Sequence, residues 1–142
     1  RIWEMGRSRV VPYDVGLLTI PDGAADVVRA LSEKYMLGIA TSRTKAGVFE
    51  SPLLAHLQQF FQVTISYEDT NNHKPHPEPL LAAAAKLNIA PEACVYIGDA
   101  ETDIEAARAA CMKVIIFSQN QLSGADASTF SFTELPALIA PL

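Results

Sequence analysis

Residues 95–104 read VYIGDAETDI: an apolar run stops at a glycine, and two aspartates follow, four residues apart. This pattern predicts a buried strand over 94–98 and a helix over 102–110. Asp99 would then lie at the C-terminal end of the strand and Asp103 in the first helical turn, at the edge where open α/β sheets bind ligands. Two carboxylates facing one point, with room for water and a phosphate, suit Mg2+ better than a softer metal. The alternative is a helix stabilised by an aspartate in its first turn.

The composition describes an ordinary globular domain, and it argues against several classes of protein. The chain has 142 residues, of which 49% are apolar and 19% charged, enough for one domain with a real core. A net charge of -5 without a Lys/Arg cluster argues against nucleic-acid binding, and no apolar run reaches the length of a membrane span. Cys94 and Cys111 are too few for a disulfide framework or a zinc site. We therefore expect a cytoplasmic protein with neither a nucleic-acid partner nor a membrane partner.

Expected strands and helices alternate along the chain with short joints. This order predicts an α/β fold, a Rossmann-like three-layer core around a mainly parallel sheet. Residues 21–142 form the core domain in this interpretation, whereas residues 1–20 show no sustained period and are expected to be the remnant of a cap or linker. The other expected helices are 22–34, 52–61, 78–87 and 133–139, and the other expected strands are 36–41, 63–67, 113–117 and a short one near Phe130.

Two further segments carry chemistry that suits the same edge of the sheet. Thr41 and Ser42 follow an expected strand, where a hydroxyl and turning backbone N–H groups can cradle phosphate oxygens, although strand-end hydroxyls usually cap the next helix. Lys74 lies in NHKPHPEP (72–79), where three alternating prolines stiffen the loop. A lysine held in one place suits the neutralisation of a carboxylate–phosphate cluster, the alternative being a solvated lysine on a rigid surface loop.

The order of hydroxyl, lysine and paired aspartates resembles that of the haloacid dehalogenase-like (HAD) hydrolase superfamily, in particular its phosphoglycolate phosphatase-like subgroup. Residues 37–42 (LGIATS) look like its second motif, 74–79 (KPHPEP) like its third, and 98–104 (GDAETDI) like its fourth. The similarity extends over roughly residues 21–140. One departure is Cys111, which stands where family members usually have a glycine before Met112.

The resemblance implies a Mg2+-dependent phosphatase that forms an aspartyl-phosphate and then hydrolyses it. Thr41 and the N–H of Ser42 would hold the phosphoryl oxygens, and Lys74 would balance the charge that develops during transfer. Asp99 would be a direct Mg2+ ligand, and Asp103 a second ligand or an orienter acting through water. The expected partner is a small phosphorylated metabolite: a sugar phosphate, phosphoglycolate, a nucleotide or a phosphonate remain open, as does dehalogenation.

The family's nucleophile belongs to a first motif, Asp-x-Asp, which this sequence does not contain. In one interpretation the motif lies upstream of Arg1, residues 1–20 end a cap inserted after it, and this chain alone is inactive. In the other, residues 17–23 are a decayed first motif with Ile20 at the nucleophile position, which gives a pseudo-enzyme because a hydrocarbon cannot attack phosphorus. A weaker variant places Asp14 at that position. The aspartates are residues 14, 22, 26, 69, 99, 103 and 126.

A missing first motif also has a structural consequence. In the family's sheet its strand lies between the strands that carry motifs two and four, so this chain is expected to lack the usual first strand. Each buried backbone group left unpaired would cost on the order of 1–3 kcal/mol. An additional N-terminal segment would complete the sheet, or residues 15–20 would, or the sheet would close up or self-associate with another copy.

Overall fold

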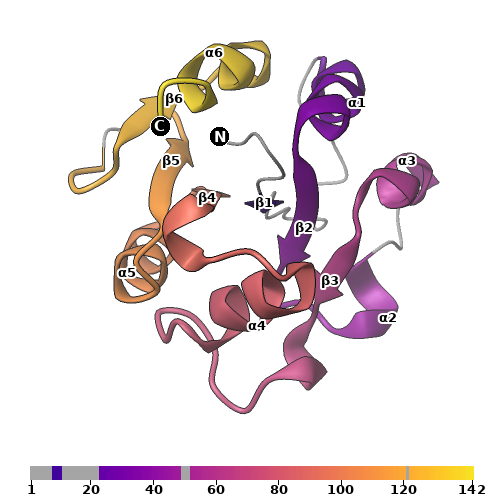
Figure 1. The fold of residues 1–142 in the computed structure, drawn as a ribbon, viewed down its shortest axis with the longest axis vertical. Coiled ribbons are helices and arrows are strands. Elements are labelled where there is room, and N and C mark those ends of the chain that lie inside the picture. The colour runs from indigo at the N-terminus through magenta and orange to yellow at the C-terminus, as the bar shows by residue number, and fades with distance from the viewer. Residues whose placement is uncertain (1–7, 11–22, 49–51, 121) are drawn as a thin grey trace.

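A parallel sheet forms the centre of the molecule in the computed structural model, which describes residues 8–10, 23–48, 52–120 and 122–142. Its six strands lie in the order β3-β2-β1-β4-β5-β6, and every neighbouring pair is parallel (Figure 1). Because all strands run the same way, their C-terminal ends meet at one edge. The strands are β1 (Ser8–Val10), β2 (Met36–Ala40), β3 (Val63–Ile65), β4 (Val95–Gly98), β5 (Lys113–Phe117) and β6 (Ala127–Thr129).

Helices cover both faces of the sheet, as the alternating sequence pattern predicts. On one face lie α4 (Glu78–Leu87), which packs on β2 and β3, and α5 (Glu101–Ala109), which packs on β4 and β5. On the other lie α1 (Ala24–Lys34) and α6 (Leu135–Ile139), which contact each other (Figure 1). The expected three-layer α/β fold is therefore confirmed. The two remaining α-helices of the described ranges, α2 (Lys45–Val48) and α3 (Pro52–Leu57), follow β2.

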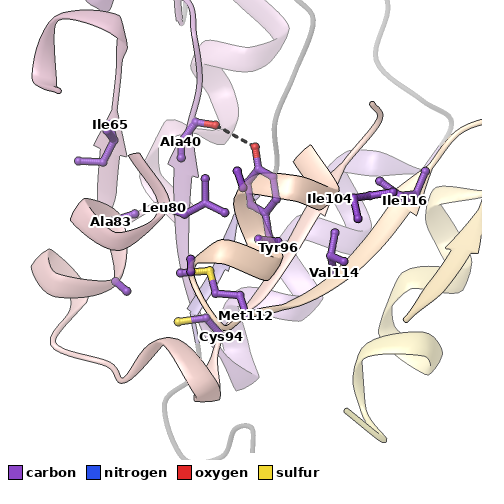
Figure 2. Packing of buried hydrophobic residues seen from close by; sticks show 14 residues of the cluster. Ala40, Ile65, Leu80, Ala83, Cys94, Tyr96, Ile104, Met112, Val114 and Ile116 are labelled. Carbon is purple, nitrogen blue, oxygen red and sulfur yellow. Dashed lines mark hydrogen bonds between the residues drawn. The ribbon is translucent and has the colours of Figure 1, made fainter. Parts of the chain in front are cut away.

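Side chains of β4 alternate between two apolar cores, one on each face of the sheet. Val95 and Ile97 point into the core beneath α1 and α6. Cys94, which precedes the strand, and Tyr96 point into the core beneath α4 and α5, where Tyr96 lies close to Leu80 (Figure 2). Because both faces of β4 are buried, its apolar run is continuous instead of alternating with polar residues.

The position between β2 and β4, where the family's first strand was expected to be lacking, is filled by β1, a three-residue strand without an Asp-x-Asp. Strand β1 pairs with β2 through Arg9 and Leu37 and with β4 through Arg9 and Val95. Ser8–Val10 therefore belongs to the sheet, between β2 and β4. The alternative strand at residues 15–20 falls outside the described residues.

Several expected elements end earlier than the apolar pattern predicted. The strand expected over 63–67 stops at Ile65 because Ser66 and Asp69 start a 3₁₀ helix, in which the Ser66 N–H and hydroxyl both donate to the Asp69 carboxylate at 2.8 Å. The helices expected over 52–61 and 133–139 each divide into a short α-helix and a 3₁₀ turn. In the described ranges, no helix is both long and apolar enough to cross a lipid bilayer.

Candidate active site

The carboxyl ends of β2 and β4 bring the predicted site residues to one edge of the sheet. Strand β2 ends at Ala40 and β4 at Gly98, so Thr41 and Asp99 each follow directly after a parallel strand. The Tyr96 hydroxyl lies 3.4 Å from the Ala40 carbonyl oxygen and joins the two strand ends (Figure 2). The same hydroxyl contacts both Lys74 and Asp103. The structure therefore gathers residues that are far apart in the sequence.

Lys74 and Asp103 form a close and shielded ion pair. The Lys74 Nζ lies 2.7 Å from Asp103 Oδ1, and the two side chains are 12% and 2% exposed. The loop that carries Lys74 is held at both ends. The backbone N–H of Asn72 donates to the Glu78 carboxylate at 2.8 Å, and the His76 N–H donates to a backbone carbonyl at 2.9 Å. The lysine is thus fixed by hydrogen bonds as well as by the prolines.

Both carboxylate oxygens of Asp103 are engaged by neighbouring donors. Oδ1 accepts from Lys74 at 2.7 Å and from the Tyr96 hydroxyl at 3.1 Å. Oδ2 accepts the backbone N–H groups of Asp99 at 2.9 Å and Ala100 at 3.1 Å. The two bonds to Oδ2 hold the backbone of Asp99 against the first turn of α5. These contacts favour Asp103 as an orienting residue over Asp103 as a second direct metal ligand.

Gly98 makes this close approach possible. A Cβ at position 98 would lie 2.4 Å from the Asp103 Cβ, 2.6 Å from its Cγ and 2.7 Å from Oδ2. Real side chains do not approach this closely, so any other residue at position 98 would push Asp103 away. The glycine at the end of the predicted strand is therefore a steric requirement of the site.

The two aspartates have opposite electrostatic environments. Partial burial, then the hydrogen bond and charge of Asp103, raises the pKa of Asp99 above its ordinary value. Burial also disfavours the charged form of Asp103, but the Lys74 ammonium and the backbone N–H groups outweigh it and lower the pKa of Asp103. Asp103 is thus the ionised partner of Lys74. A bound cation would lower the pKa of Asp99 more than that of Asp103, because Asp103 already has a cationic neighbour.

The fit of the described residues to a Mg2+ ion depends mainly on Asp99. Asp99 is exposed and offers a hard oxygen donor at the edge of the sheet, whereas the oxygens of Asp103 are already engaged. No group of three or more His, Cys, Asp or Glu side chains in the described ranges is placed to hold a metal ion. Mg2+ usually takes one or two carboxylates and completes its shell with water and phosphate, so Asp99 fits as one ligand.

Thr41 and Ser42 follow the C-terminal end of β2 directly. Thr41 is 8% exposed; its N–H donates to the Ile65 carbonyl at 2.9 Å, and its Oγ1 accepts the Arg43 N–H at 3.1 Å. The Thr41 hydroxyl hydrogen is left to donate elsewhere. Ser42 is exposed, and its N–H has no partner within the described part of the chain. One hydroxyl hydrogen and one amide thus remain without a partner among the described residues at this end of β2.

Tyr96 is the site residue that sequence analysis missed. It belongs to an apolar run, and an aromatic residue in a buried strand is ordinarily a core residue. The one available signal was chemical: Tyr96 is the polar member of the run, and a buried phenol usually finds a hydrogen-bond partner. Its partners come from three different segments, which no local pattern indicates.

Comparison with known proteins identifies the family of the chain. The family model of haloacid dehalogenase-like hydrolases matches residues 14–117, and the chain belongs to this family. It is 40% identical over 128 residues to a phosphoglycolate phosphatase of Salmonella choleraesuis, covering 82% of this chain and 50% of the relative. A phosphoglycolate phosphatase of Escherichia coli is 43% identical over 89 residues, covering 61% of this chain and 34% of the relative.

Solved structures show the same fold. A HAD-superfamily hydrolase from Ehrlichia chaffeensis superposes with a TM-score of 0.75 at 28% identity, over 87% of this chain and 59% of that one. A subfamily IA hydrolase of this superfamily from Geobacter sulfurreducens has a TM-score of 0.74 at 25% identity, over 84% and 56%. The chain thus spans about half the length, or less, of the curated relatives named above.

Proposed function

We propose that the chain is the phosphate- and metal-binding part of a Mg2+-dependent phosphoric monoester hydrolase that acts through an aspartyl-phosphate. The shielded Lys74–Asp103 pair, beside Thr41 and Asp99 at the edge of a parallel sheet, carries this proposal. The substrate is a small phosphorylated metabolite. The similarity to phosphoglycolate phosphatases favours a short phosphorylated carboxylic acid.

Each residue has a distinct task in this proposal. Thr41 donates its hydroxyl, and Ser42 its backbone N–H, to oxygens of the transferring phosphoryl group. The Lys74 ammonium balances the negative charge on those oxygens, and Asp103 keeps the ammonium in place.

Mg2+ would be held by Asp99, and when bound it would neutralise phosphoryl charge. Asp103 supports that task indirectly, because its Oδ2 accepts the Asp99 N–H at 2.9 Å and so fixes the backbone from which the ligand projects.

The attacking aspartate is proposed to come from outside these 142 residues, because the sequence has no Asp-x-Asp. The chain alone is then expected not to turn over substrate. A second candidate function is an inactive binding or regulatory domain that keeps the phosphate and metal cradle. It is favoured by β1, which occupies the position between β2 and β4 yet carries only Ser, Arg and Val.

Two measurements separate these candidates. The intact mass and N-terminal sequence of the native protein establish whether an Asp-x-Asp segment precedes residue 1. Mg2+-dependent hydrolysis of p-nitrophenyl phosphate by that native protein, lost on Asp99→Asn, would support the phosphatase. Absence of turnover together with retained binding of inorganic phosphate would support the binding domain, and absence of both would refute both candidates.

A further inference from the structure

Tyr96 places a polar group where the apolar core meets the candidate site. Its side chain is 0% exposed and lies among apolar side chains from β2, α4 and α5, including Ala40, Leu80 and Ile104 (Figure 2). Its ring therefore has little freedom to move. The hydroxyl at the end of that ring is fixed in space by the packing of the core.

The hydroxyl closes a triangle of hydrogen bonds with Lys74 and Asp103. Lys74 Nζ donates to the Tyr96 oxygen at 2.9 Å and to Asp103 Oδ1 at 2.7 Å. Tyr96 has one proton to donate, and its two acceptors are Asp103 Oδ1 at 3.1 Å and the Ala40 carbonyl at 3.4 Å. The carboxylate is both nearer and charged, so it receives the proton. Burial, followed by the charge of Asp103, raises the pKa of Tyr96, which keeps the phenol protonated.

This triangle determines the direction of the remaining donor on Lys74. An ammonium has three N–H groups, and two of them meet Tyr96 and Asp103. Within the described ranges the third makes no hydrogen bond. With Asp103 alone, the ammonium could rotate about a single contact. With Tyr96 as a second fixed acceptor, the third N–H is held in one direction.

We propose that Tyr96 is a positioning residue that aims the Lys74 ammonium at the phosphoryl group. The phosphoryl group as the target of Lys74 rests on the proposed function, whereas the triangle of hydrogen bonds is observed in the structure. Tyr96 acts through Lys74 and does not touch the substrate. Its packing against the end of β2 also keeps the lysine in register with Thr41, the residue after Ala40.

The test compares Tyr96→Phe with Tyr67→Phe in the 142-residue chain. Both changes remove one phenolic oxygen, but the Tyr67 side chain is 49% exposed and its hydroxyl has no hydrogen-bond partner in the described part of the chain. Binding of inorganic phosphate is measured by calorimetry, and the Lys74 ammonium is observed by 1H–15N NMR. Tyr96→Phe is expected to weaken phosphate binding about three- to tenfold and to broaden or shift the ammonium signal. Tyr67→Phe should change neither.

A Lys74→Met background distinguishes positioning from a merely structural role. If Tyr96 acts through Lys74, Tyr96→Phe has no further effect on phosphate binding once the ammonium is absent. An equal loss of affinity in both backgrounds would overturn the proposal, as would an unchanged ammonium signal in Tyr96→Phe.

Failure of the proposed function gives a different result. If Lys74→Met does not weaken phosphate binding, the phosphate site is wrong, and the NMR signal alone then decides whether Tyr96 positions Lys74. Should Tyr96→Phe fail to fold, site-specific 3-fluorotyrosine at position 96 keeps the ring and the hydroxyl but weakens the oxygen as an acceptor. A shifted ammonium signal supports the proposal in that variant too, and an unchanged one overturns it.

Discussion

Among the described glycines whose φ is not positive, Gly98 should be the one at which an added methyl group damages the site most. The replacement that tests this is Gly98→Ala. The added Cβ would lie 2.4 Å from the Asp103 Cβ, whereas ordinary contacts begin at 3.4 Å, so the first turn of α5 must move by about 1 Å. Such a shift breaks the bonds from the Asp99 and Ala100 N–H groups to Oδ2. Two hydrogen bonds to a charged group contribute about 1.5–3 kcal/mol each, so the loss should be about 3 kcal/mol or more.

Urea unfolding measures this loss directly. With a slope of about 1–3 kcal/mol per molar urea, the midpoint should fall by about 1–3 M. Gly47→Ala is the matched control: the new Cβ meets only the Thr44 Oγ1 at 3.3 Å, and alanine is the better helix former, so the change should be within about 1 kcal/mol. If Gly98→Ala costs less than about 1 kcal/mol, or no more than Gly47→Ala, the steric argument is refuted.

Three further changes test the charges and the backbone. Asp103→Asn leaves the Lys74 ammonium without its countercharge and should cost about 3–5 kcal/mol of unfolding free energy in urea titrations; a loss below 1 kcal/mol would contradict a shielded ion pair. Cys111→Gly should raise the melting temperature, because Cys111 has a φ of 64°, where a side chain costs about 1–2 kcal/mol. Asn88→Gly (φ 59°) should have less effect, because asparagine tolerates that region. Equal effects of the two replacements would argue against backbone strain at Cys111. The Ser66 N–H and hydroxyl lower the pKa of Asp69 below its ordinary value of 3.8. The ionised Asp69 therefore stabilises the folded state above pH 3.8, and this stabilisation is lost as the pH falls through the pKa that Asp69 has in the folded protein. The difference in stability between the wild type and Asp69→Asn should therefore shrink in acid, and a difference independent of pH would count against this linkage.

Long apolar-periodic segments were predictable because a helix or a buried strand is encoded within its own residues. The helix Glu78–Leu87 and the strand Lys113–Phe117 have the predicted bounds, since their apolar residues recur with a clear period. Strand β1 has three residues and α2 has four, too few for any period to emerge. Their formation depends on neighbours that lie far away in the sequence.

The sequence by itself determined which chemistry is available: a strand-end hydroxyl, one lysine on a stiff loop, and two aspartates around a strand–helix turn. The tertiary structure alone decided how these groups are used. Asp103 is occupied on both oxygens, Gly98 is needed for its approach, and Tyr96 holds Lys74. The contacts of Lys74 with Tyr96 and Asp103, and of Tyr96 with Ala40, join residues 22, 29 and 56 positions apart, so they are set by the order of strands in the sheet. The contacts of Asp103 with Gly98 and Asp99 are local to the strand–helix turn, but only the folded geometry shows how close they are.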